Sequence, residues 1–296
     1  MEKSKLTMNS IVNKLDELPT LPAVVYELSK VISDPMSSTS DVEKIMANDQ
    51  SMTAKVLKLV NSAYYAIPGG VSSLARAISY IGFDTVHQLV LSTSIINALE
   101  FPQGESFDLN KFWEHSIGVG IAAETLAKFV RHPSPSDMFT CGLVHDMGKI
   151  AMYMTDAEEM VRISDHAVAN NLSYFEAEEV MEAPHHTVVG QMLAEKWNLP
   201  TLIQAVIKNH HQKDPRMRGG ISAELSQTVD IIYIANLFTH ALKFGKSGHN
   251  KILGAPKDVM ERLRIDAQKD FKPLIKDIKV NLERGEEFIR VIGGGR

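Results

Sequence analysis

Apolar residues recur at every third or fourth position along nearly the whole chain, while the alternating runs typical of strands are nearly absent. This spacing predicts a succession of helices joined by short connectors that contain proline or glycine. Residues 51–65 are predicted to form an amphipathic helix that packs on a core. The apolar face of this helix carries Met52, Val56, Leu59 and Val60. Residues 84–99 are largely apolar, which predicts a helix buried between others.

The break FPQGES at residues 101–106 separates two regions of different chemistry. The region before it shows no metal-ligand chemistry, whereas the region after it contains all the histidine clusters described below. We therefore expect an all-α, multi-helix bundle in which an N-terminal helical subdomain packs on a metal-site subdomain. The predicted parts are residues 1–102, residues 103–250 for the metal-binding part, and a charged helical tail over residues 251–296.

The composition is that of an ordinary globular protein. Of the 296 residues, 44% are hydrophobic and 23% are charged, and the formal net charge is -5. These values argue against a long disordered tail and against a general affinity for the nucleic-acid backbone. The segments DVEKIMAND and SMTAKVLKLV could form a helix-turn-helix, but they have no cluster of basic residues to contact phosphates. Nucleic acid is therefore not an expected partner.

The single cysteine and the lengths of the apolar stretches indicate the cellular compartment of the protein. The only cysteine, Cys141, cannot form a disulfide within the chain, which fits a reducing environment. No apolar stretch reaches the roughly 18 residues that a membrane-spanning helix requires, and the segment MEKSKLTMNSIVNKLDELPT lacks the apolar core of a signal peptide. We expect a cytoplasmic protein with no membrane partner.

Histidine is the unusual component of this sequence. There are 11 histidines, and the clusters are His115, His145 next to Asp146, His185–His186 and His210–His211. The pair His145–Asp146 lies in CGLVHDMGKI, whose flanking pattern predicts a helix. Imidazole is a strong neutral metal ligand, and a carboxylate can bridge two cations that lie roughly 3.5–4 Å apart. Lys149 is expected on the same helical face, where it could contact a phosphate or neutralise Asp146.

The other clusters lie in helical settings of their own. His115 lies within KFWEHSIGVGIAAETLA, His186 opens HTVVGQMLAEKW, and His210 and His211 end TLIQAVIKNHH. Each histidine alone is more often a surface or core residue than a ligand, but together they predict one shared metal site. His185 would point elsewhere from the start of its helix. The residues without a comparable setting, expected to be structural or on the surface, are His87, His132, His166, His240 and His249.

The ordered series of His115, His145–Asp146 followed by Gly148–Lys149, His186 and His210–His211 resembles the HD superfamily of metal-dependent phosphohydrolases. The chain is more closely similar to the HDOD subfamily, which is related to HD-GYP proteins, over roughly residues 15–240. The matching segments are LPTLPAVVYELSKVISDP, KVLKLVNSAYY, ARAISYIGFDTVHQLVL, GLVHDMGKI, AEKWNLP and ANLF. The resemblance implies an HD-like helical bundle with the site in its middle. It also implies a role in bacterial signal transduction, with another signalling protein as partner.

One position departs from the pattern of active HD enzymes, which have a final aspartate on a late helix. The matching residue here is Asn236, whose amide oxygen can coordinate a metal but is neutral. A metal shared by His115, His145 and Asp146 would thus have less charge compensation. A second metal near Asp146, His186, His210 and His211 would keep its ligands. Imidazole-rich ligation favours iron, manganese, zinc or nickel over magnesium or calcium.

Two functions follow from these residues. The first, which Asn236 favours, is a regulatory module with one or two bound metal ions and weak or no hydrolysis. The alternative is an active phosphohydrolase or phosphodiesterase that acts on a phosphate-containing small molecule, a nucleotide or cyclic dinucleotide. In that case Asp146 and Lys149 are the expected catalytic residues, with Lys149 and the cations stabilising the charge that develops on the phosphoryl group.

Overall fold

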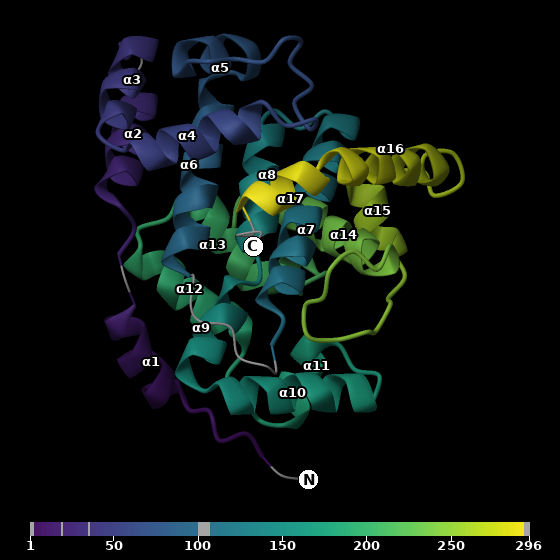
Figure 1. Cartoon of the computed structure of the whole chain (residues 1–296). Coiled ribbons are helices and arrows are strands. Elements are labelled where there is room, and N and C mark those ends of the chain that lie inside the picture. Colours follow the sequence, from purple (N-terminus) through teal and green to yellow (C-terminus); the bar gives the residue numbers. More distant parts are fainter. Residues whose placement is uncertain (1–2, 19, 35, 100–106, 293–296) are drawn as a thin grey trace.

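The computed structural model describes residues 3–18, 20–34, 36–99 and 107–292. Within these ranges the chain forms helices and turns and has no strand (Figure 1). The all-α prediction is confirmed. The predicted boundary between residues 102 and 103 lies outside the described residues, so the division into three parts stays a prediction.

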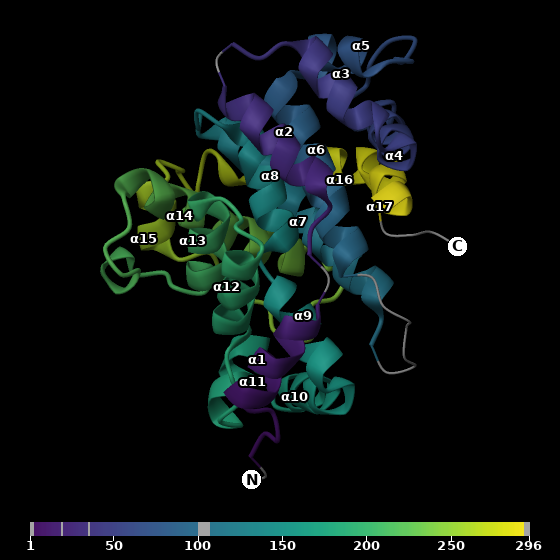
Figure 2. The same cartoon turned by 90° about the vertical axis from the view of Figure 1, so that its left-hand side faces the viewer.

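The first helices form a group at one end of the molecule, around the long helix α6 (Figures 1 and 2). This group consists of α2 (Ala23–Ser33), α3 (Thr39–Ala47), α4 (Gln50–Val60), α5 (Leu74–Ile81) and α6 (Phe83–Ala98). Helix α6 contacts α2, α4 and α5 and also packs on α8 of the neighbouring helices. Most of its side chains are buried on several faces, as the apolar pattern of residues 84–99 predicts.

Helix α4 confirms the amphipathic pattern but is shorter than predicted. The four buried residues on its apolar face are Met52, Val56, Leu59 and Val60. The helix ends at Val60, because Asn61 turns its side chain to the backbone of Val71. The Asn61 amide donates to the Val71 carbonyl oxygen at 2.8 Å and its oxygen accepts from the Val71 amide at 2.6 Å. These two bonds start a loop where the sequence pattern predicted further helix.

Helix α1 (Met8–Glu17) packs on α9 rather than continuing into α2 (Figure 2). The residues before it are held to the same part of the molecule. Ser4 donates its backbone amide to the carbonyl oxygen of Met181 at 2.8 Å, and Lys5 donates its amide to the Glu159 carboxylate at 2.9 Å. The N-terminal segment therefore spans from α10 and α11 up to the α6 group.

The centre of the fold is the pair α7 (Leu109–Phe129) and α8 (Pro135–Val144), with α14 (Ala223–Ala241) against both. Glycines permit the close contact of α7 and α8: a Cβ atom on Gly142 would lie 2.7 Å from the backbone of Gly120. Around this centre lie α9 (Met147–Thr155), α10 (Ala157–Ala169), α11 (Tyr174–Val180), α12 (His186–Lys196) and α13 (Thr201–Asn209).

The C-terminal residues pack on the rest of the molecule through α15 (Lys257–Arg262), α16 (Phe271–Arg284) and α17 (Glu286–Ile292). Helix α16 lies along α7, where the Asn281 amide donates to the Thr125 hydroxyl oxygen at 2.9 Å. Helix α17 buries Phe288 against Tyr64, with 5.8 Å between ring centroids. The tail thus bridges α7 and the α6 group (Figure 1).

Among the residues that the structure describes, every helix is too short or too polar to cross a bilayer.

Helices α9 and α12 approach each other so closely at Gly148 that a Cβ atom there would lie 1.9 Å from the carbonyl oxygen of His186. In an unpacked helix, glycine to alanine stabilises by about 1 kcal/mol. We expect Gly148→Ala instead to destabilise the protein and to lower its free energy of unfolding by about 3 kcal/mol. The new methyl group would meet backbone atoms, which cannot move aside as a flexible side chain can.

Urea denaturation measures this difference. The control is Gly254→Ala, since a Cβ atom at Gly254 meets no atom within 4 Å. Equal stability of the two variants would show that the α9–α12 contact does not require glycine.

Candidate metal centre

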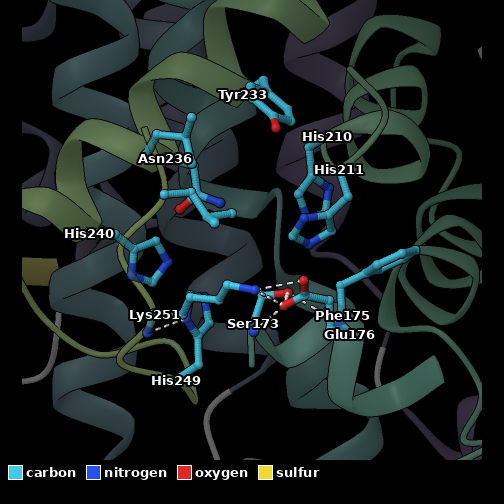
Figure 3. Close-up of a pocket in the computed structure, with 12 residues that line it drawn as sticks. Ser173, Phe175, Glu176, His210, His211, Tyr233, Asn236, His240, His249 and Lys251 are labelled. Carbon is cyan, nitrogen blue, oxygen red and sulfur yellow. Dashed lines mark hydrogen bonds and ion pairs between the residues drawn. The ribbon is translucent and has the colours of Figure 1, made fainter. Parts of the chain in front are cut away.

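The structure brings together all the residues predicted for the metal site, from five places in the chain. His115 lies on α7, and Asn236 lies on α14. His186 is the first residue of α12. His210 and His211 follow the last turn of α13, and His145 and Asp146 lie between α8 and α9. Figure 3 shows His210, His211 and Asn236 facing a common space.

The predicted helix through His145 and Asp146 is wrong. Helix α8 ends at Val144 and α9 begins at Met147, with Asp146 at φ −101° and ψ 11°. The apolar residues on both sides continue the helical spacing, so the pattern alone does not show the break. The turn lets α9 change direction and pack on α12 through Gly148.

Four ligand atoms, one of them an oxygen of Asp146, lie within 4.8 Å of one another. The Oδ1 atom of Asp146 lies 3.2 Å from His186 Nε2 and 3.4 Å from His210 Nε2. His186 Nε2 lies 3.3 Å from His210 Nε2 and 3.1 Å from His211 Nε2. We call Asp146, His186, His210 and His211 the four-ligand group.

A second group shares Asp146 and consists of His115, His145 and Asp146. The other carboxylate oxygen of Asp146, Oδ2, lies 3.3 Å from His145 Nε2. Asn236 adds its side-chain oxygen to this group, since Oδ1 lies 3.0 Å from His115 Nε2. We call His115, His145 and Asp146 the three-ligand group; the neutral amide of Asn236 lies beside it, where the resemblance to active HD enzymes implies a carboxylate.

Neighbouring acceptors fix the orientation of four of the imidazole rings. The Nδ1 atom of His145 lies 2.7 Å from the carbonyl oxygen of Gly142, and that of His210 lies 2.9 Å from the carbonyl oxygen of Ile207. His115 Nδ1 similarly faces the Phe244 carbonyl oxygen at 3.3 Å. Because a carbonyl oxygen only accepts, the ring proton belongs on Nδ1, and Nε2 presents its lone pair to the centre.

Glu178 plays the same part for His186 and was not identified from the sequence. Its carboxylate accepts from the backbone amide of His186 at 2.8 Å and lies 2.9 Å and 3.0 Å from His186 Nδ1. The side chain is fully buried on α11, eight positions before His186. Its segment YFEAEEV reads as an ordinary amphipathic helix, so no local pattern marks this carboxylate.

These residues fit a metal ion. His145 Nε2 and Asp146 Oδ1 are buried and have no hydrogen-bond partner among the described residues. The Nε2 atoms of His186 and His210 cannot donate to each other once both rings carry the proton on Nδ1. Buried lone pairs that converge in this way are costly unless a cation satisfies them. The set of three imidazoles and one carboxylate suits a transition metal.

Burial keeps the rings of His115 and His210 available as ligands. Burial lowers the pKa of His115 to about 3 and that of His210 to about 4, so both rings are neutral at neutral pH. Burial by itself would raise the pKa of Asp146, but His145 and Lys149 outweigh it and hold the pKa well below its usual value. Asp146 is therefore ionised, as a metal ligand must be.

Lys149 neutralises Asp146, which is one of the two roles predicted for it. Its Nζ atom donates to Asp146 Oδ2 at 2.7 Å and to the carbonyl oxygen of Ser247 at 3.0 Å. The ammonium also lies 4.8 Å from the centre of the Tyr174 ring. The Lys149 side chain is buried. Its ammonium and His145 of the three-ligand group both face Asp146 Oδ2.

Two histidines that the sequence left as structural or surface residues lie in the centre. The ring centroids of His115 and His240 are 4.5 Å apart, and those of His240 and His249 are 4.2 Å apart. Both line a cavity that also contains His211 (Figure 3). Neither lies in a segment whose spacing predicts a shared site: His240 lies in the last turn of α14, and the return of the chain after α14 places His249 beside it.

The other histidines lie apart from the ligand groups. His185 turns its ring to Phe175, with 4.6 Å between centroids. His87, His132 and His166 contact Ser29, Ser134 and Asn170, respectively.

The comparisons with known proteins agree with this geometry. The family model of the HDOD domain matches residues 18–213. An HDOD domain protein of unknown function from Geobacter sulfurreducens has a TM-score of 0.76 at 21% identity, over 95% of this chain and 99% of that chain. A candidate phosphohydrolase from Shewanella amazonensis SB2B has a TM-score of 0.69 at 23% identity, over 96% of this chain and 97% of that chain.

A candidate signal transduction protein from Marinobacter aquaeolei VT8 has a TM-score of 0.73 at 18% identity, over 97% of this chain and 64% of that chain. A protein of Treponema pallidum (strain Nichols) is 22% identical over 275 residues, which are 93% of this chain and 51% of that protein. This chain therefore spans about half the length of that relative. At these identities the solved structures show a shared fold. Because the family model matches more than half of the residues, the chain belongs to the HDOD domain family.

Proposed function

We propose that this chain is a regulatory signal-transduction module that binds one transition-metal ion at the four-ligand group and has weak or no hydrolytic activity. The observation that carries the proposal is the arrangement of the ligand atoms of Asp146, His186, His210 and His211. Adjacent pairs of these atoms lie 3.1–3.4 Å apart. Iron, manganese, zinc and nickel suit this imidazole-rich set better than magnesium or calcium. A cation bound there would supply Lewis-acid stabilisation to a phosphoryl oxygen.

The three-ligand group supports the regulatory part of the proposal. Asn236 adds no negative charge beside His115, and the Lys149 ammonium already lies 2.7 Å from Asp146 Oδ2. A second divalent cation at this place would be repelled by Lys149 and would have a single carboxylate to share. Two-metal hydrolysis needs both cations, so one well-held ion favours a structural or sensing role.

The partner in this proposal is another signalling protein, and the compartment is the cytoplasm. Cys141, the single cysteine, is free and buried, which suits a reducing environment. Nucleic acid and membrane are not part of the proposal.

An active phosphohydrolase or phosphodiesterase is the second candidate function. One observation favours it: a cavity lined by His210, His211 and Asn236 lies directly beside both ligand groups. A reacting phosphate could reach the centre from that cavity.

Metal analysis tests the proposal. The purified protein, stripped and reconstituted, should hold about one equivalent of transition metal. His186→Ala removes a direct ligand. Removal of an outer-shell partner typically lowers metal affinity by about 10–100-fold, and we expect His186→Ala to lower it by more than that. The control is His166→Ala, since His166 lies on α10 and contacts Asn170. Wild-type protein without bound transition metal would refute the proposal.

Glu178→Gln should lower metal affinity by about 10–100-fold while the fold is kept, because the amide removes the negative charge that orients and polarises His186. A competition titration with a chromophoric chelator measures the affinity. Glu179→Gln changes the neighbouring, exposed carboxylate and should have no effect. If the two variants bind metal equally well, Glu178 has no role in holding the ligand.

Asn236→Asp should raise the metal content toward two equivalents, since a carboxylate beside His115 adds the charge that the three-ligand group lacks. Elemental analysis gives the stoichiometry, and hydrolysis of a chromogenic phosphodiester is measured on the same samples. Asn170→Asp adds the same charge at the exposed residue that follows α10 and serves as control. Strong hydrolysis by the wild-type protein that Asp146→Ala abolishes would favour the second candidate function instead.

A further inference from the structure

A cavity of about 180 Å³ opens beside the metal centre. Figure 3 shows its walls: Asn236 and Tyr233 from α14, His210 and His211 after α13, and His249 and Lys251 from the segment after α14. Three of these residues, His210, His211 and Asn236, also belong to the metal centre. A ligand in the cavity would therefore lie against a bound cation.

The wall formed by the segment after α14 presents hydrogen-bond donors. The backbone amide of Lys251 donates to His249 Nδ1 at 3.2 Å, which places the ring proton of His249 on Nε2. In Figure 3 the hydroxyl group of Tyr233 lies on the side of its ring that faces His210 and His211. Burial raises the pKa of Tyr233, so this hydroxyl keeps its proton and can donate.

The carboxylates near the cavity are already neutralised. Both oxygens of Glu176 lie 2.7 Å from Lys251 Nζ, and one of them accepts from the backbone amide of Ser173 at 2.7 Å. Asp146 is paired with Lys149 at 2.7 Å. With these charges balanced, a cation at the metal centre leaves the cavity positive, and its free donors suit an oxyanion.

The size of the cavity limits the ligand. Pockets that enclose drug-sized molecules have about 300–1,000 Å³, and a cyclic dinucleotide is at least as large as such a molecule. A volume of about 180 Å³ is enough for one phosphoryl group with a short substituent. Phe175 and Leu253 add apolar surface to the lining, where such a substituent could lie.

We propose that this cavity is a binding subsite for a small phosphate monoester, with Tyr233 and His249 as hydrogen-bond donors to the phosphoryl oxygens. The inference rests on the proposed function, because the bound cation supplies part of the attraction. It narrows the ligand from any phosphate-containing molecule to one with a single terminal phosphoryl group, and it excludes cyclic dinucleotides.

Calorimetric titration of the whole 296-residue chain, loaded with metal, tests the subsite with three probes: inorganic phosphate, glycerol 3-phosphate and a cyclic dinucleotide. Phosphate and glycerol 3-phosphate should compete for one site, and the cyclic dinucleotide should not displace them. Tyr233→Phe and His249→Gln should each weaken phosphate binding by about tenfold, the loss expected for one hydrogen bond to a charged group. Lys246→Met alters an exposed lysine on the same segment and should bind as the wild type does.

The proposal is overturned if the cyclic dinucleotide binds as tightly as phosphate, or if Tyr233→Phe and His249→Gln both bind phosphate as well as Lys246→Met does. Metal content is measured in the same samples, and each variant is checked by thermal melting. Metal binding without phosphate binding would overturn the subsite alone. If the protein takes up no transition metal on reconstitution but still binds phosphate in a way that needs Tyr233 and His249, the metal site of the proposed function is overturned and the subsite stands.

Discussion

The carboxylate of Asp146 is the charge on which the surrounding structure depends. It is ionised and fully enclosed, a state that is costly unless cations and donors surround it. Its Oδ1 atom faces the four-ligand group, and its Oδ2 atom faces His145 and Lys149. The helix ends near it supply the remaining partners: the start of α12 contributes His186, and the end of α13 contributes His210 and His211. The break between α8 and α9 and the contact at Gly148 can be understood as the geometry that brings these ends to one carboxylate.

Sequence patterns predict much of the fold, because each helix buries a face whose spacing can be read along the chain. The apolar spacing of residues 84–99 is sufficient to place α6 in the interior. Helix ends are less predictable, since they depend on single side chains. Asn61 ends α4 by bonding to a residue ten positions later, and the break at Asp146 interrupts an unbroken apolar spacing.

The residues of the candidate site likewise fall into those that the sequence predicts and those that it does not. His115, His186 and His210 could be proposed as ligands because the order and setting of the histidines match a known series. Glu178, His240 and His249 could not, because no local pattern marks them and their positions follow from how the chain turns and packs. Glu178 reaches His186 across the turn between α11 and the start of α12, and His249 reaches the cavity through a segment that the motif does not include. Residues that support a ligand are therefore harder to find from sequence than the ligand itself.

The segment between α14 and α15 limits where such a domain can be cut and joined to another protein. The family model ends at residue 213, yet the Phe244 carbonyl orients His115, the Ser247 carbonyl holds Lys149, and Lys251 forms part of the cavity wall. A fragment trimmed to the matched residues would contain the whole four-ligand group but would lack α14, which packs on α7 and α8 at the centre of the fold. Transplanting this domain into another protein thus requires residues up to at least 251, and natural rearrangements that break the chain earlier would remove both a core helix and one wall of the ligand chamber.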